Sequence, residues 1–312
     1  MPCFANQKST PRGCPPAGIS RWHVSRRRLA AGTASRCRGT SGAWRTPVPL
    51  RESSRGAEFP VTQPYADFRP FEQANPRGRF PALLVCDHAV NTVPQELGGL
   101  GLDARELERH IGWDPGARAV TLELATLLDA PALLAGYSRL VIDPNRSPQS
   151  ETSILENSDG TIIPGNIGLD ADARHDRITA CFRPYHDAID TTLDGLGPRC
   201  AALLCIHTFT PALAGDGIAR PWHASILWGG GQAQFAERIR IGLGQVTGLN
   251  IGNNEPYAQT PEFGYTAEAH GEVRGLPNLL IEIRQDLLED EDAPRKWANH
   301  LAEVLVAELA TV

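Results

Sequence analysis

The sequence predicts a three-layer α/β domain whose sheet is mixed but mostly parallel. Short, continuously apolar segments alternate along the chain with longer segments whose apolar residues recur at helical spacing. Continuous apolar runs are typical of strands buried on both faces, and strands separated by helices favour parallel pairing. We find no internal repeat and no second periodic region, so we expect one domain over residues 56–312.

The elements are predicted in order from about residue 80. Apolar runs such as FPALLVC and AALLCIHTF predict strands at 80–86, 131–142 (in two parts), 201–209, 224–229 and 278–284. Apolar residues at helical spacing predict helices at 104–112, 115–130, 174–196, 233–246 and 293–309. Asp114 and Pro115 stand at the start of the second helix, where Asp is a good N-cap and Pro is favoured in the first turn.

The first 55 residues differ in composition from the rest of the chain. They hold eleven Lys and Arg but only one acid, and they show no apolar periodicity, so we expect a disordered basic tail. Met occurs only at position 1, and a true start at a later Val or Leu codon is an open alternative. The remaining residues hold 19 basic and 35 acidic side chains, an excess of negative charge that argues against nucleic-acid binding.

Cysteine usage and hydropathy predict the compartment. The seven cysteines form no CxxC pair, and their odd number argues against a disulfide framework, which favours a reducing cytoplasm. No apolar run is long enough for a membrane helix, so we expect no membrane partner.

Polar residues lie at or near the ends of four of the apolar runs. His88 follows LLVCD, Asp143 follows RLVI, His207 follows LLCI, and Glu282 lies within LLIEIR. Ligands of α/β sheets bind beyond the carboxyl ends of the strands, so we expect these side chains to gather at one edge. Two histidines there favour a divalent metal, while a hydrogen-bonded structural role for each is the alternative.

Asp114, Arg139 and Arg146 extend this predicted site, and Glu282 has a specific role in it. Asp114 is either a helix cap alone or an additional oxygen ligand. Arg146 follows the turn sequence DPN and can bind a carboxylate with two hydrogen bonds, with Arg139 as a second cation nearby; the alternative for Arg146 is a salt bridge with Asp143. Glu282 beside a metal-activated water can act as a general base and then an acid, whereas its structural alternative is an ion pair with Arg284.

The chain resembles the N-formylglutamate amidohydrolase family, in its broader branch of predicted amidohydrolases, from about residue 70 to 310. The resemblance is carried by LLVCDHAVNTVP, HIGWDPGARAV, SRLVIDPNRSP, FRPYHDAI, CIHTFTP and GYTAEAHGEVRGLPNLLIEIRQD. It implies a phosphorylase/hydrolase-like fold related to zinc carboxypeptidases, and hydrolysis of a linear amide in a substrate such as N-formylglutamate.

The resemblance also implies roles for residues. Glu282 resembles the catalytic glutamate of zinc carboxypeptidases, Asn145 and Arg146 their carboxylate-binding Asn-Arg pair, and His88 and His207 their zinc histidines. The carboxypeptidase pattern His-x-x-Glu is absent, because Asn91 stands where the acid is expected. Zinc-dependent muramoyl-alanine amidases of similar fold take their acidic ligand from the start of the following helix, where Asp114 lies in this chain. This resemblance favours Asp114 over Asn91 as third zinc ligand. A non-catalytic protein that binds a small carboxylate is the alternative function.

Overall fold

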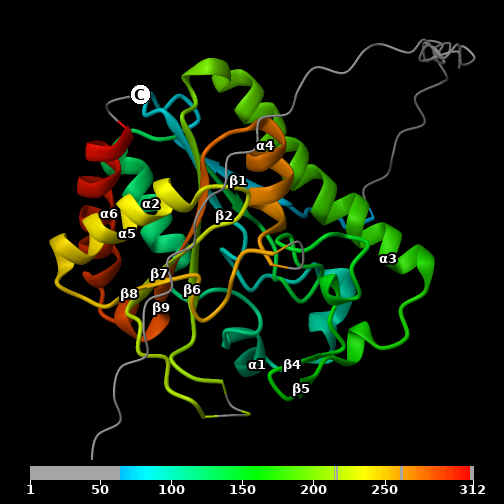
Figure 1. Ribbon diagram of the computed structural model, residues 1–312. Helices are drawn as coiled ribbons and strands as arrows, with labels where there is room; N and C mark the ends of the chain where they lie inside the picture. Colours follow the sequence, from blue (N-terminus) through cyan, green and yellow to red (C-terminus); the bar gives the residue numbers. More distant parts are fainter. Residues whose placement is uncertain (1–63, 214, 216, 261–262, 310–312) are drawn as a thin grey trace, which may run out of the picture. The chain divides into compact units, whose positions relative to one another are not determined.

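The computed structural model describes residues 64–213, 215, 217–260 and 263–309, so the predicted tail at 1–55 lies outside the described residues. Seven strands form one sheet in the order β1-β3-β2-β6-β9-β7-β8 (Figure 1). Neighbours from β3 to β9 are parallel, as are β7 and β8, whereas β1 and β7 run antiparallel to β3 and β9. The predicted mixed, mostly parallel sheet is thus confirmed. The strand bounds are β1 Phe71–Ala74, β2 Ala82–Cys86, β3 Ala132–Ala135, β6 Ala202–Phe209, β7 Ala224–Leu227, β8 Ile251–Asn253 and β9 Asn278–Arg284.

Helices cover both faces of the sheet because the central strands are apolar on both sides. Leu84 of β2 packs in a cluster with α2, α5 and α6, whereas Leu83 and Val85 pack in a second cluster with α4 and the π-helical turn before it. Figure 1 shows these two helical layers on opposite sides of the sheet. The helix bounds are α1 Ala104–Glu108, α2 Ala117–Leu128, α3 Ala171–Arg177, α4 Arg183–Leu196, α5 Ala233–Thr247 and α6 Ala293–Leu309.

Several predicted elements differ in the structure. The second part of the predicted strand at 131–142 is wrong, because residues after β3 form buried turns in which Ser138 and Asp143 bond to Thr92 and Ser153 through their backbones. The helix predicted at 104–112 ends at Glu108, whose carbonyl accepts a hydrogen bond from the Trp113 indole (3.0 Å). The short strands β1 and β8 and the hairpin of β4 (Asn157–Ser158) and β5 (Thr161–Ile162) were not predicted.

Two further expectations can be compared with the described part of the chain. Its four cysteines are all free thiols, and three of them (Cys86, Cys181 and Cys205) are buried. None of its helices has the length and apolar character needed to cross a membrane.

Candidate active site

The register of the sheet places two predicted site residues side by side. His207 of β6 pairs with Glu282 of β9, and Glu282 in turn pairs with Ser225 of β7. Both side chains leave the same face as Cys205 and Leu280, which precede them by two residues and lie in the cluster with α4. His207 and Glu282 therefore lie next to each other near the carboxyl ends of the parallel strands.

Two histidines converge there on one carboxylate. Asp114 Oδ2 lies 3.3 Å from His88 Nδ1 and 2.9 Å from His207 Nδ1, and all three residues are at most 4% exposed. One ligand atom from each of the three lies within 4.8 Å of the others, a spacing that fits a single metal ion. Asn91, the less favoured alternative for the third ligand, does not line the pocket beside them.

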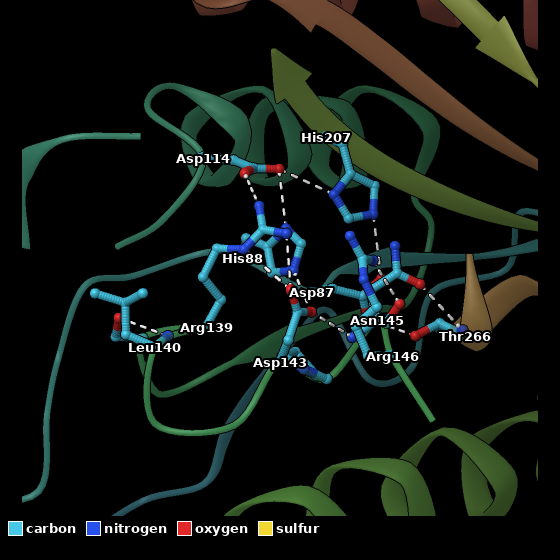
Figure 2. A network of polar contacts seen from close by, with 12 residues as sticks. Asp87, His88, Asp114, Arg139, Leu140, Asp143, Asn145, Arg146, His207 and Thr266 are labelled. Carbon is cyan, nitrogen blue, oxygen red and sulfur yellow. Dashed lines mark hydrogen bonds and ion pairs between the residues drawn. The ribbon is translucent and has the colours of Figure 1, made fainter. Parts of the chain in front are cut away.

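The far nitrogen of each imidazole ring meets a second carboxylate. His88 Nε2 lies 2.8 Å from Asp143 Oδ1, and His207 Nε2 lies 3.2 Å from Asp87 Oδ2. Figure 2 shows Asp114 between the rings, with Asp143 and Asp87 on their far sides. A carboxylate that accepts the Nε2–H proton leaves Nδ1 as the lone-pair donor and fixes the ring orientation, as metal-binding histidines require.

The helix start explains why Asp114 is available to the histidines. Helix α2 begins only at Ala117, after Gly116 in a left-handed conformation with φ 86°, so Asp114 does not cap it as the sequence had suggested. The Asp114 backbone N–H instead donates to the His88 carbonyl (2.9 Å), and its side chain also accepts from the Thr208 N–H (3.2 Å). The loop before α2 is thereby attached to both β2 and β6.

The electrostatics of the triad favour a positive charge between the histidines. Burial disfavours the ionised form of Asp114, but His88 and His207 outweigh it and hold the pKa of this carboxyl far below its ordinary value. Burial likewise disfavours the charged form of His207, whereas hydrogen bonds to Asp114 and Asp87 raise the pKa of its imidazole to about 10. A proton or a metal ion can supply this positive charge.

Asp87 is a site residue that the sequence analysis missed. It is fully buried, and its Oδ1 accepts hydrogen bonds from the hydroxyls of Tyr185 and Thr266, both 2.8 Å long, while Oδ2 faces His207. Burial raises the pKa of this carboxyl, but the hydrogen bond from His207 and the other partners reverse the shift and lower it. Its position directly after an apolar strand could have identified it, as it did for His88.

A pocket of about 150 Å³ opens beside the triad. The Arg146 guanidinium lies in its wall, 4.2 Å from the Phe263 ring centroid, and its one hydrogen bond to the described residues is to the Asn145 carbonyl (2.9 Å). The salt bridge to Asp143 considered for Arg146 is instead made by Arg139, which donates to that carboxylate at 2.7 and 3.1 Å. Arg146 thus retains donors for a ligand, whereas Arg139 is largely occupied.

Asn145 directly precedes Arg146 and links their loop to the segment that carries Thr266. Its Oδ1 accepts from the Thr266 N–H at 3.2 Å, so its Nδ2 amide is the part of the side chain left to donate. Asn145 lines the same pocket as Arg146 and is 4% exposed. The two residues therefore present donors to one ligand.

The side chain of Glu282 lines the same pocket and makes no hydrogen bond or ion pair with the described part of the chain. It is 8% exposed, and burial raises the pKa of its carboxyl while His207 and His88 oppose that shift. Residues two apart in a strand share a face, yet Arg284 at the end of β9 turns to Asp286 (2.7 Å) and to the Arg220 carbonyl (3.1 Å). The structural alternative, a Glu282–Arg284 ion pair, is therefore not formed.

Comparison with known proteins supports an enzymatic site. The model of the N-formylglutamate amidohydrolase family matches residues 80–289. Among solved structures, gene product Atu2144 of Agrobacterium tumefaciens is similar at 32% identity and a TM-score of 0.72, over 77% of this chain and 95% of that one. An N-formylglutamate amidohydrolase from Ralstonia eutropha JMP134 has the same fold at 20% identity and a TM-score of 0.63, over 78% of this chain and 98% of that one.

A search of curated proteins gives no match. The family model and the 32% identical structure together cover most of the described domain. The chain therefore belongs to the N-formylglutamate amidohydrolase family and is a hydrolase of amide bonds.

Proposed function

We propose that this protein is a zinc-dependent amidohydrolase that cleaves the linear amide of an N-formyl or N-acyl amino acid such as N-formylglutamate. The observation that carries the proposal is the arrangement of His88, His207 and Asp114 next to the unpaired, buried carboxyl of Glu282. The family match supports the reaction class. Zinc and the residue roles are inferred from the site, and the substrate class is inferred from the family.

The donor set fits a catalytic zinc ion. Two imidazole nitrogens and one carboxylate are a known ligand set for catalytic zinc, which keeps a further coordination position open. His88 Nδ1, His207 Nδ1 and an Asp114 oxygen would hold the ion, and Asp143 and Asp87 would orient the two rings from behind. Bound zinc supplies Lewis acidity, lowering the pKa of a water to about 7 and polarising the substrate carbonyl.

Glu282 is proposed to move the proton. Its carboxylate takes a proton from the attacking water as the new C–O bond forms, and delivers it to the amine nitrogen as the C–N bond breaks. For an N-formyl substrate the products are formate and the free amino acid. Burial keeps the pKa of Glu282 above its ordinary value, which brings it nearer to that of a base working around neutral pH.

Arg146 and Asn145 are proposed to anchor the substrate carboxylate. The planar guanidinium of Arg146 can donate two parallel hydrogen bonds to a carboxylate, and the Asn145 amide adds another donor. Arg139 lines the same pocket, where it adds positive charge while it pairs with Asp143 and Asp114. A second cavity of about 230 Å³ shares Arg139 and Tyr257 with the first, which leaves room for acyl groups larger than formyl.

The binding-only alternative was motivated by the missing acid of the His-x-x-Glu pattern. Asp114 supports the catalytic proposal against it, because this carboxylate contacts both histidines from another part of the chain. Glu282 supports it too, since a buried carboxyl with no partner among the described residues costs stability, and a catalytic role would explain why it is kept.

Metal analysis combined with hydrolysis of N-formyl-L-glutamate tests the proposal. We expect one zinc per chain, release of formate by the wild type, loss of this release with a chelator, and recovery when zinc is added back. His207→Ala should lose both zinc and activity, whereas the control His175→Ala, at an exposed histidine of α3, should lose neither. Wild-type protein that hydrolyses the substrate without a stoichiometric divalent ion, at a rate unaffected by chelators, would overturn the metal assignment.

A further inference from the structure

A hydrogen-bonded series of three side chains, those of His186, His270 and Asp190, lies behind the loop that carries Asn145 and Arg146. His186 of α4 places Nε2 3.0 Å from the Pro144 carbonyl oxygen and Nδ1 2.7 Å from His270 Nε2. His270 lies in the π-helical turn Ala267–Gly271, and its Nδ1 is 2.7 Å from Asp190 Oδ1. The chain thus runs from Asp190, whose side chain is 45% exposed, inward to Pro144.

The two ends of this chain fix where its protons lie. A carbonyl oxygen only accepts, so His186 must carry a proton on Nε2 to bond to Pro144. The carboxylate of Asp190 also only accepts when ionised, so His270 must carry a proton on Nδ1. If both rings were neutral, two lone pairs would face each other across the 2.7 Å contact between them.

One additional proton resolves that conflict. Placed between His186 Nδ1 and His270 Nε2, it makes the contact a hydrogen bond and gives the histidine pair one positive charge. The negative charge of Asp190 lies one hydrogen bond away from the pair, although Arg274 shares its Oδ1 atom at 2.8 Å. Burial opposes the added proton and lowers the pKa of both imidazoles, so the proton is inferred from the 2.7 Å contact between the two ring nitrogens. Both rings are nearly parallel (11° between planes) and less than 10% exposed, so water does not easily replace these bonds.

The inner end of this hydrogen-bonded series holds the loop at 143–146, the anchor loop, through the Pro144 carbonyl. Pro144 has no N–H to donate, and His186 is the partner of its carbonyl within the described residues. On either side, Asp143 bonds to His88, and Asn145 accepts a hydrogen bond from the Thr266 N–H through its side-chain oxygen. The orientation of the Pro144 peptide therefore sets where Asn145 and Arg146 present their donors.

We propose that Asp190, His270 and His186 form a singly protonated hydrogen-bonded chain that positions the Asn145–Arg146 carboxylate anchor from behind. None of the three lines the substrate pocket, so they are positioning residues. This inference rests on the proposed function, since it assigns a role in binding the carboxylate of that substrate.

Asp190→Asn is the decisive variant because it keeps the size of the side chain and removes the balancing charge. Its matched control is Asp194→Asn, one turn further along α4, which also removes an acidic partner of Arg274 but has no bond to His270. His186→Phe removes the bond to Pro144 while keeping an aromatic ring against Phe182 and Tyr265. His186→Gln restores an N–H donor and serves as the conservative rescue.

We expect Asp190→Asn and His186→Phe to raise KM for N-formyl-L-glutamate by about three- to tenfold, the worth of one hydrogen bond, with kcat and zinc content nearly unchanged. His186→Gln should recover part of the loss, and Asp194→Asn should match the wild type. A fall in kcat without a rise in KM in Asp190→Asn, or an equal effect of Asp194→Asn, would overturn the proposal. If His186→Phe does not fold, the KM of Asp190→Asn still tests the proposal, because Asp190 is half-exposed and its substitution should leave the fold intact.

A second measurement needs no turnover. The short hydrogen bond between the rings should give a strongly downfield imidazole N–H proton resonance in the wild type and in Asp194→Asn, lost in His186→Phe and shifted or lost in Asp190→Asn. If the wild type lacks this resonance, the proposed hydrogen-bonded series of Asp190, His270 and His186 is wrong. A wild type that shows the resonance but does not hydrolyse N-formyl amino acids contradicts the proposed function, and leaves the hydrogen-bonded chain standing.

Discussion

Glu282→Gln separates a catalytic from a structural role of the carboxyl at the edge of the sheet. Gln keeps the shape of the side chain and removes its ability to accept and return a proton. Positioned proton transfer contributes about 10²–10⁴-fold to rate, so we expect turnover to fall by at least two orders of magnitude. That corresponds to a loss of about 2.7 kcal/mol or more in transition-state stabilisation.

The same variant should be as stable as the wild type or more stable, although its turnover falls. The pKa of Glu282 is raised above 4.5 in the folded protein, so its ionisation is easier in the unfolded chain. Such a group destabilises the fold as pH rises from about 4.5 through the folded pKa, and the penalty is fully present above it. Gln carries no charge, so for zinc-free protein at neutral pH we expect a melting temperature equal to or above that of the wild type.

Formate release, zinc content and thermal unfolding measured on the one variant decide between the two roles. Asp286→Asn is the control, because it breaks the ion pair that Arg284 makes and should cost at most about 1 kcal/mol with no loss of rate. A Glu282→Gln protein that is destabilised but hydrolyses N-formyl-L-glutamate at the wild-type rate would refute the mechanism.

Four other outcomes are expected. Arg146→Ala should raise KM for a carboxylate-bearing substrate by about 10- to 150-fold through the loss of charged hydrogen bonds. Arg146→Lys should recover only part of this loss, because Lys lacks the planar guanidinium; an Arg146→Ala protein with the KM of the wild type would contradict the anchor role. Asp143→Asn should weaken zinc binding about 10- to 100-fold by loosening His88, as measured by competition with a chromophoric chelator. Zinc binding must displace a proton from His207, whose pKa is raised to about 10, so the apparent zinc affinity should rise with pH from about 6.5 to 10. A zinc affinity that does not change with pH in this range would contradict the prediction. A chain starting at Ala57 should unfold at the same temperature as the full chain, since the basic composition of residues 1–55 predicts no packed structure.

Sequence periodicity was sufficient to predict the sheet and most of its helices because the central strands are buried on both faces. It failed after β3, where SRLVI is as apolar as a strand but its backbone forms turns, a difference decided by hydrogen-bond partners that are distant in sequence. It also missed β1 and β8, which are four and three residues long, too short for a pattern to be distinguished from a loop.

The site was predictable to the extent that it follows strand ends. His88, His207 and Glu282 were found this way, whereas the family resemblance was needed to prefer Asp114 over Asn91. The roles of Asp87 and of Arg139 depend on which carboxylate faces which ring or guanidinium, and that follows from strand register and loop paths. Composition and spacing contain no such information.

The charge balance of the site gives a further argument for a divalent ion. The edge of the sheet gathers four acidic side chains, two arginines and two histidines: Asp87, Asp114, Asp143, Glu282, Arg139, Arg146, His88 and His207. With the acids ionised and the imidazoles neutral, these groups sum to two negative charges in a poorly hydrated place, which is costly to leave unbalanced. A proton on His207 balances part of this charge, as its raised pKa indicates. One divalent cation between Asp114 and the histidines balances all of it and frees both Nδ1 atoms as ligands, so the same charges that strain the metal-free site favour binding of the metal.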